Sequence, residues 1–365
     1  MKILIAAGIF PPDVGGPATY SKILGGELAA RGHTVRVVTY TDSENRKIGK
    51  SDYPIHLIVR SPFKPWRYFK FFRALIKHGR DADLIYAQGP VSDGYPAYMA
   101  ARYLKKPLAV KITGDYSWER AASEGLTDVL IDEFQTLKDY PPAIRRMRDV
   151  QHTVCHHARI IITPSEYLKK LVTGWGIKPE KIKVVYNAVE RPEVRSQKSE
   201  VRRKLGIAEN TFLILSSGRD VPWKGFALLA EAAAELQTLH PEMEIKILHR
   251  AGRAELHEHI RAADVYVLNT GYEGLSNTLV EVLHLGTPII TTNVCGNPEV
   301  IKHEQNGLLV DYNNKAQLSE AIMRIYSDKN LRDELRNNAR LSLEKFTLDN
   351  MINETERLLI ELVGK

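Results

Sequence analysis

The segment Gly271-Tyr272-Glu273-Gly274-Leu275-Ser276-Asn277-Thr278-Leu279-Val280-Glu281 places two carboxylates eight residues apart. The apolar run Val265–Leu268 before it predicts a β-strand, and the pattern of Asn277–Leu285 after it predicts a helix that Gly286 ends. Glu273 is then expected in the strand-to-helix loop and Glu281 a little over two turns into the helix. At about 3.6 residues per turn, eight positions return a side chain to nearly the same helix face.

The start of this predicted helix is suited to an anion. A helix N-terminus offers free N–H groups and the positive end of the helix dipole, so it binds phosphate readily. Carboxylates on either side of a phosphate site suit a ligand with hydroxyls at both ends and phosphates between them. The pattern therefore favours a nucleotide sugar as the ligand.

The segment resembles the Glu-x7-Glu motif of retaining glycosyltransferases of family 4, which have the two-domain GT-B fold. The resemblance runs through most of the chain, and further motifs occur in the family's order: Gly15-Gly16-Pro17, Asn187-Ala188-Val189, Ser217-Gly218-Arg219 with Lys224-Gly225, Gly286-Thr287-Pro288, Pro298-Glu299-Val300-Ile301 and Asn306-Gly307-Leu308-Leu309-Val310. Two glutamates alone would be typical of a solvated helix face, but the ordered set makes coincidence a poor explanation.

Composition agrees with a globular protein of two domains. A chain of 365 residues is long for a single hydrophobic core and long enough for two domains. Of these residues 44% are hydrophobic and 26% charged, as in ordinary globular proteins. The chain has no run of 18 apolar residues, so no membrane span is predicted. The short opening run Lys2–Ala7 predicts a buried strand rather than a signal peptide. The two cysteines, Cys155 and Cys295, form no disulfide framework, which favours a reducing cytoplasm.

Positive charge is concentrated in the first half. Residues 1–187 hold 29 Lys and Arg against 18 Asp and Glu, whereas the whole chain has a net charge of only +7. Any anionic surface that the protein meets is therefore expected to be met by the first half.

The alternation of short apolar runs and helical patterns predicts an α/β fold with parallel sheets. We expect two Rossmann-like domains facing across a cleft: residues 1–187 as the acceptor domain, residues 188–346 as the nucleotide-sugar domain, and a helix in 347–365 that packs back on the first. The acidic stretch 121–138 is interpreted as a surface insertion, and 190–199 as an interdomain hinge. No Gly-x-Gly-x-x-Gly follows the first strand, which argues against a dinucleotide cofactor.

The chain departs from the family pattern at two places. Only 48 positions separate Gly225 from Glu273, about one strand–helix unit of roughly 20 residues less than usual, so the second domain is expected to be shortened near 249–255, where the family contacts the base. Related enzymes also commonly carry a histidine where Thr113 stands, so that histidine's role cannot be transferred.

The resemblance implies roles for residues of the second half. Arg219 and Lys224 would neutralise the diphosphate leaving group, Glu273 would bind the donor sugar, and Glu281 the ribose hydroxyls. The amides of Leu275, Ser276 and Asn277 would hold the distal phosphate, and Gly218 and Gly274 are also expected to bind the donor. The alternative for Arg219 and Lys224 is a solvated loop.

Two candidates lie in the first half. Gly15 and Gly16 precede a predicted helix, and a backbone without side chains there can approach a donor closely, although a tight turn would also use glycine. Asp115, with Tyr116, Trp118 and Glu119 nearby, follows a strand and is the best substitute for the missing histidine. The alternative for Asp115 is a structural role in its loop.

The segment from Arg60 to Arg80 interleaves seven basic residues with aromatic ones. A basic, aromatic amphipathic helix can lie on an anionic bilayer, so peripheral contact with the inner face of a membrane and a lipid-linked acceptor are expected. The alternative is a helix packed on the core through Phe69, Phe72 and Ile76, with a basic outer face.

The sequence therefore predicts a cytoplasmic, retaining hexosyltransferase that moves a sugar from a nucleoside diphosphate to a hydroxyl acceptor. No metal is expected, because no Asp-x-Asp pair or His/Cys cluster has clear ligand spacing, and no cofactor beyond the donor is implied. Three alternatives are weighed: a GT-B sugar-nucleotide epimerase, a non-catalytic nucleotide-sugar-binding protein, and a nucleic-acid-binding protein, which the absence of a recognition motif disfavours.

Overall fold

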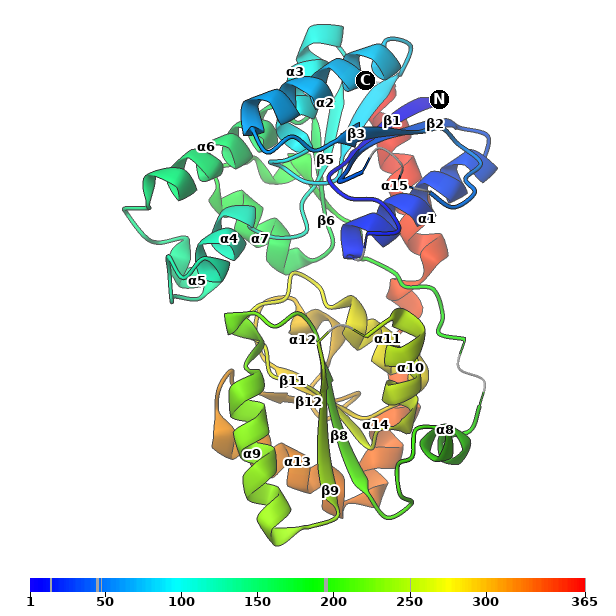
Figure 1. Ribbon diagram of the computed structural model, residues 1–365, viewed down its shortest axis with the longest axis vertical. Helices are drawn as coiled ribbons and strands as arrows, with labels where there is room; N and C mark the ends of the chain where they lie inside the picture. Colours follow the sequence, from blue (N-terminus) through cyan, green and yellow to red (C-terminus); the bar gives the residue numbers. More distant parts are fainter. Residues whose placement is uncertain (14, 44–45, 47, 194–195, 250, 365) are drawn as a thin grey trace. The chain divides into compact units, whose positions relative to one another are not determined.

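The computed structural model describes residues 1–13, 15–43, 46, 48–193, 196–249 and 251–364 (Figure 1). The chain folds as two compact units, Met1–Val185 with Asp349–Lys365, and Tyr186–Leu348. The domain limits expected from the sequence lie within two residues of these limits.

Unit 1 is built on a seven-stranded parallel sheet in the order β3-β2-β1-β4-β5-β6-β7. Because the strand order reverses between β1 and β4, the carboxyl ends of these two strands mark the place where such sheets bind ligands. The strands are β1 Lys2–Ala7, β2 Thr34–Thr41, β3 Ile55–Val59, β4 Leu84–Ala87, β5 Leu108–Lys111, β6 Ile160–Thr163 and β7 Ile182–Val184. The helices are α1 Gly16–Ala30, α2 Lys64–Gly79, α3 Gly94–Leu104, α4 Tyr116–Ser123, α5 Ile131–Phe134, α6 Pro142–His157, α7 Glu166–Gly174 and α15 Leu348–Val363.

The last helix, α15, belongs to unit 1 although it follows unit 2 in the chain. The Tyr20 hydroxyl of α1 lies 3.4 Å from Thr355 Oγ1, and Arg31 Nη1 donates to Glu356 Oε2 at 2.6 Å. These contacts join residues more than 300 positions apart, and Figure 1 shows α15 beside α1.

One buried cation of unit 1 has no hydrogen-bond partner. Lys111 ends β5, is 1% exposed, and its Nζ lies 3.7 Å from the centre of the Tyr20 ring, a cation–π contact. Burial lowers the pKa of Lys111 to about 7. Burial therefore disfavours the charged form of the Lys111 side chain.

Two sequence interpretations in unit 1 are wrong. Residues 121–138 are no surface insertion, because they include α5 and bury Ile131 and Phe134 completely. Helix α2 does not pack through Phe69, which is 44% exposed; its buried positions are Phe71, Ala74, Leu75 and Gly79. The predicted helix is confirmed, but its buried face differs from the predicted one.

Unit 2 holds a five-stranded parallel sheet in the order β12-β11-β10-β8-β9. Its strands are β8 Phe212–Ser217, β9 Met243–Leu248, β10 Val265–Leu268, β11 Ile289–Thr292 and β12 Leu308–Val310. Its helices are α8 Lys198–Lys204, α9 Phe226–Leu239, α10 Arg253–Ala262, α11 Asn277–Leu285, α12 Asn297–Val300, α13 Lys315–Ser327 and α14 Lys329–Leu341. Helices α9 and α13 contribute to the core on one side of the sheet, and α8, α10 and α11 to the core on the other.

The strand order of unit 2 bears on the expected shortening. In the common doubly wound order 3-2-1-4-5-6 a third strand flanks the second. Here β9 takes the second position, α10 runs from it directly to β10, and the described residues of unit 2 place no strand outside β9. That the unit is shorter than its family's usual layout stays a prediction.

Candidate functional site

The loop and helix around the two glutamates form as the sequence predicts. Helix α11 spans Asn277–Leu285, and the Ser276 side chain caps it by accepting from the Leu279 N–H at 3.4 Å. Gly286 follows in the left-handed conformation, with φ 70°, and ends the helix. Glu273 lies in the loop between β10 and α11, and Glu281 lies buried on the helix.

Glu273 is in direct contact with Lys224. The Lys224 ammonium donates to Glu273 Oε1, and the two side chains are 11% and 20% exposed. Lys224 ends a short 3-10 turn after β8, and Gly218 lies beside it, since a Cβ on Gly218 would stand 3.4 Å from Lys224 Cε. The structure thus brings together two residues that the sequence assigned to the diphosphate and to the sugar.

Gly225 fixes this turn against the end of β10. Its φ is 55°, and a Cβ there would lie 2.4 Å from the Asn269 carbonyl oxygen, so only glycine fits without displacement. The Asn269 side-chain amide donates to the Gly225 carbonyl at 3.0 Å. Lys224 is therefore held by backbone geometry as well as by its ion pair.

The loop that carries Glu273 is held by its backbone on two sides. The Gly271 N–H donates to the Trp223 carbonyl at 2.7 Å, and the Gly296 N–H donates to the Glu273 carbonyl at 2.9 Å. A Cβ on Gly296 would lie 2.2 Å from the Gly274 carbonyl oxygen, so this close approach also requires glycine. Sequence reasoning missed Gly296; a glycine just before Asn297-Pro298 was the only signal.

Glu281 has partners that sequence reasoning did not identify. Arg253, the first residue of α10, donates to Glu281 Oε1 from Nε at 3.0 Å, and its Nη2 lies 2.9 Å from the same oxygen in an ion pair. His257, one turn further along α10, places Nε2 3.5 Å from Glu281 Oε2. No local sequence pattern links α10 to α11, so only the fold reveals this cluster.

Tyr266 lies buried on β10 near both glutamates. Burial raises its pKa well above the ordinary value, and the charges of Glu273 and Glu281 raise it further. The hydroxyl stays protonated and lies 2.8 Å from Ser217 Oγ, at the end of β8. Tyr266 thus contributes no charge to the site. The charges of the site come from its loop and helix residues.

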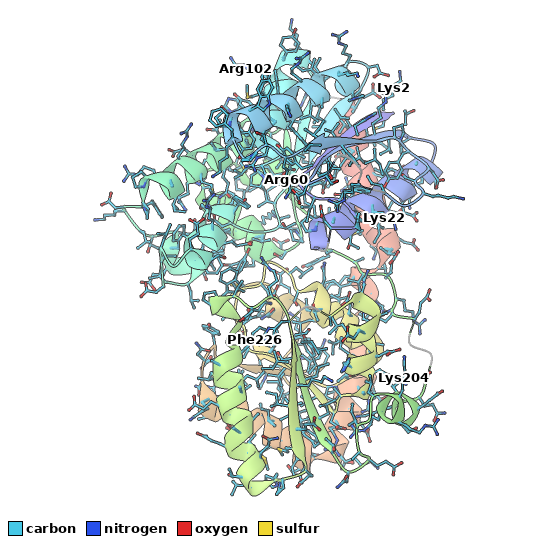
Figure 2. The ribbon with its side chains drawn as sticks, viewed as in Figure 1. Lys2, Lys22, Arg60, Arg102, Lys204 and Phe226 are labelled. Atoms are coloured by element: carbon cyan, nitrogen blue, oxygen red, sulfur yellow. The ribbon has the colours of Figure 1, made fainter. Side chains whose placement is uncertain are left out.

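The remaining candidate residues of unit 2 lie just after β8 and at the start of α11. Arg219 is exposed and directly follows Gly218 at the end of β8. Leu275 and Ser276 are buried at the start of α11, and the Asn277 side chain accepts from the Asn187 amide at 3.4 Å. Phe226, labelled in Figure 2, begins α9 and meets the His249 ring edge-on at 5.1 Å.

The structure places Asp115 in a structural position. It is 0% exposed and caps α4 by accepting from the backbone N–H groups of Ser117 and Trp118 at 2.9 and 3.2 Å. The side-chain amides of Gln135 and Gln151 also donate to it, at 2.8 and 3.2 Å. Its carboxylate is thus engaged by protein groups, and the structural alternative fits it better than a catalytic role.

Gly15 and Gly16 stand where α1 begins. Gly15 is its N-cap and Gly16 its first residue, while Val14 lies outside the described residues. The Ala18 and Thr19 N–H groups both bond to the Gly15 carbonyl at 3.1 Å. This geometry serves both the tight turn and the donor loop considered from the sequence, so the donor role stays a prediction.

In the part of the chain that the structure describes, no group of three His, Cys, Asp or Glu residues could hold a metal ion. None of the described helices combines the length and hydropathy needed to cross a bilayer.

Family models match both units. The model described as Glycosyltransferase Family 4 matches residues 14–191, and the model for Glycosyl transferases group 1 matches residues 237–342. The uncharacterized glycosyltransferase MJ1607 of Methanocaldococcus jannaschii is 25% identical, with all of both chains covered. LpsD of Rhizobium meliloti, a lipopolysaccharide core biosynthesis glycosyltransferase, is 28% identical over 54% of this chain and 60% of its own length.

A solved structure shows the same fold. The crystal structure of Anabaena Alr3699/HepE in complex with UDP and glucose has a TM-score of 0.75 at 18% identity, covering 98% of this chain and 99% of that one. With two parallel-sheet α/β units and these family matches, the chain belongs to the glycosyltransferases of family 4 and has the GT-B fold.

Proposed function

We propose that this family 4 member is a retaining hexosyltransferase whose donor is a nucleoside-diphosphate sugar bound to unit 2. The observation that carries the proposal is the contact between Lys224 and Glu273 beside the N-terminus of α11. It places a cation for the diphosphate and a carboxylate for the sugar side by side, next to amides that can hold phosphate. The UDP in the Alr3699/HepE complex supports this class of donor.

The residues would divide the donor between them. Lys224 and Arg219 neutralise the diphosphate, the amides of Leu275 to Asn277 take its distal phosphate, and Glu281 accepts from the ribose hydroxyls. Glu273 orients the sugar. In the absence of donor, Glu273 also neutralises Lys224, so the buried cation is not left unpaired.

Retention follows from substitution on one face of the sugar. The bond from the anomeric carbon to the diphosphate oxygen breaks, the bond to the acceptor oxygen forms on the same side, and the departing phosphate oxygen takes the acceptor proton. Lys224 and Arg219 stabilise the negative charge that develops on the leaving group, which is the task a metal ion performs in other transferases. The enzyme is therefore proposed to be metal-independent.

The acceptor is proposed to be lipid-linked and used at the inner face of the cytoplasmic membrane. Helix α2 exposes Trp66 and Phe69 among basic residues, Phe63 precedes it, and the neighbouring α3 exposes Tyr103. The stretches 60–80 and 94–106 contain no Asp or Glu. A basic and aromatic surface of this kind suits an anionic bilayer, and a relative acts in lipopolysaccharide core synthesis.

The donor assignment can be tested by binding. A thermal-shift panel of UDP, ADP, GDP and their sugar conjugates should identify the donor, because a ligand at about 100 times its Kd adds about 2.7 kcal/mol of stability. Lys224→Ala should then lower kcat by roughly 100- to 1,000-fold, the effect of losing one preorganised electrostatic group. Near-normal turnover in that variant would refute the assignment, and donor binding without transfer would favour a non-catalytic binding protein.

A further inference from the structure

Helix α10 directs two side chains at one carboxylate of α11. Arg253 and His257 stand four positions apart, so they share one helix face. Arg253 Nε donates to Glu281 Oε1 at 3.0 Å, and Nη2 lies 2.9 Å from the same oxygen in an ion pair. The second oxygen, Oε2, has His257 Nε2 at 3.5 Å, and that nitrogen makes no hydrogen bond of acceptable geometry.

Arg253 lines a cavity of unit 2, and Glu281 is not among the lining residues. The cavity has a volume of about 890 Å³, and Glu190, Arg203, Lys204, Arg253 and His257 are among its lining residues. The Arg253 side chain is 35% exposed, whereas that of Glu281 is 9% exposed. Arg253 Nη1 also lies 3.6 Å from Glu190 Oε2. The guanidinium thus bridges a buried carboxylate and a solvent-facing one.

The position of Arg253 needs a compensating anion. A cation in the first turn of a helix faces the positive end of the helix dipole, an unfavourable arrangement. Glu281 supplies the opposite charge, and the planar guanidinium fork restricts the carboxylate to few orientations. Because Arg253 occupies only Oε1, Oε2 keeps lone pairs that can accept hydrogen bonds from hydroxyl groups.

We propose that Arg253 is a positioning residue for the pentose of the donor: it fixes the Glu281 carboxylate so that Oε2 receives the pentose hydroxyls. The inference rests on the proposed function, in which Glu281 binds the ribose. It adds a residue outside the Glu-x7-Glu segment to the donor site. It also predicts that Arg253 acts through those hydroxyls and not through the phosphates.

The test is a cycle of two changes, one in the protein and one in the ligand. Binding of UDP, ADP and GDP to the full-length protein is measured by calorimetry, and the tightest is compared with its 2′,3′-dideoxy analogue. Wild-type protein should lose about ten-fold in affinity when the hydroxyls are removed, as expected for hydrogen bonds to a charged group. Arg253→Gln should bind the parent nucleotide about ten-fold more weakly, yet lose less than about three-fold on removal of the hydroxyls.

Matched variants separate this role from general effects of charge or folding. Arg203→Gln changes the same residue type in the lining of the same cavity and should behave like wild type in both arms. Arg253→Lys keeps the charge without the fork and should recover only part of the affinity. In turnover, Arg253→Gln should raise the donor KM and leave kcat nearly unchanged. Thermal unfolding of each variant confirms that it is folded.

Each other outcome overturns the inference. An equal loss from the dideoxy analogue in wild type and Arg253→Gln would show that Arg253 does not act through the pentose hydroxyls, with the donor site itself intact. The same weakening in Arg203→Gln would reduce the effect to general charge. Failure of wild type to bind any of the three nucleotides would instead overturn the proposed function, and this inference with it.

Discussion

Replacing Lys111 by methionine should stabilise unit 1. The ammonium is 1% exposed and has no hydrogen-bond partner, and burial lowers its pKa from 10.5 to about 7. One pKa unit corresponds to about 1.4 kcal/mol, so the difference represents a destabilisation of about 5 kcal/mol at low pH. Methionine keeps the chain length without the charge, but it loses the cation–π contact with Tyr20, worth about 2 kcal/mol when desolvated. A net gain of about 2–3 kcal/mol at neutral pH is expected.

The gain should depend on pH in a defined direction. Because the folded-state pKa lies below the unfolded-state value, the penalty of Lys111 is largest below pH 7 and vanishes above about pH 10.5. Between these limits it should shrink by about 1.4 kcal/mol for each pH unit. The difference between Lys111→Met and wild type should therefore fall steadily as the pH rises from 7 to 9.

Urea unfolding followed by tryptophan fluorescence can measure this difference. In a Trp223→Phe background the remaining tryptophans, Trp66, Trp118 and Trp175, all belong to unit 1. Lys22→Met serves as the control, because Lys22 is an exposed lysine on α1 (Figure 2). Equal stabilities for the two variants at pH 7, or a difference that does not change with pH, would refute the reasoning.

Two further predictions concern the donor site and the membrane. Glu281→Gln should raise the donor KM with little change in kcat, whereas Glu273→Gln should also lower kcat, because the sugar changes charge in the transition state and the ribose hydroxyls do not. Identical kinetics for the two variants would contradict this division. Wild-type protein should sediment with liposomes that contain anionic lipid at low salt and be released at high salt. The double variant Lys64→Glu with Lys70→Glu should abolish the binding, because each basic residue near such a surface contributes about 1 kcal/mol. Protein that remains in the supernatant at low salt would favour a soluble acceptor.

Local signals in the sequence are enough to predict the elements that carry the donor residues. The strand before Glu273 and the helix Asn277–Leu285 form where predicted, because hydrophobic periodicity, the Ser276 cap and the Gly286 stop all act within a few residues. The parallel architecture of both units follows from the alternation of strands and helices in the same way. Several different motifs in a fixed order then indicate the family.

Only the tertiary structure decides which side chains meet. Lys224 contacts Glu273 across 49 positions, and Arg253 contacts Glu281 across 28, because the strand order sets β8 beside β10 and α10 beside α11. The Asp115 carboxylate likewise accepts a hydrogen bond from Gln151, 36 positions away. No short-range pattern encodes such pairings: they arise when the strands assemble in an order that differs from their order in the chain, and that assembly decides which residues form the site and which support the fold.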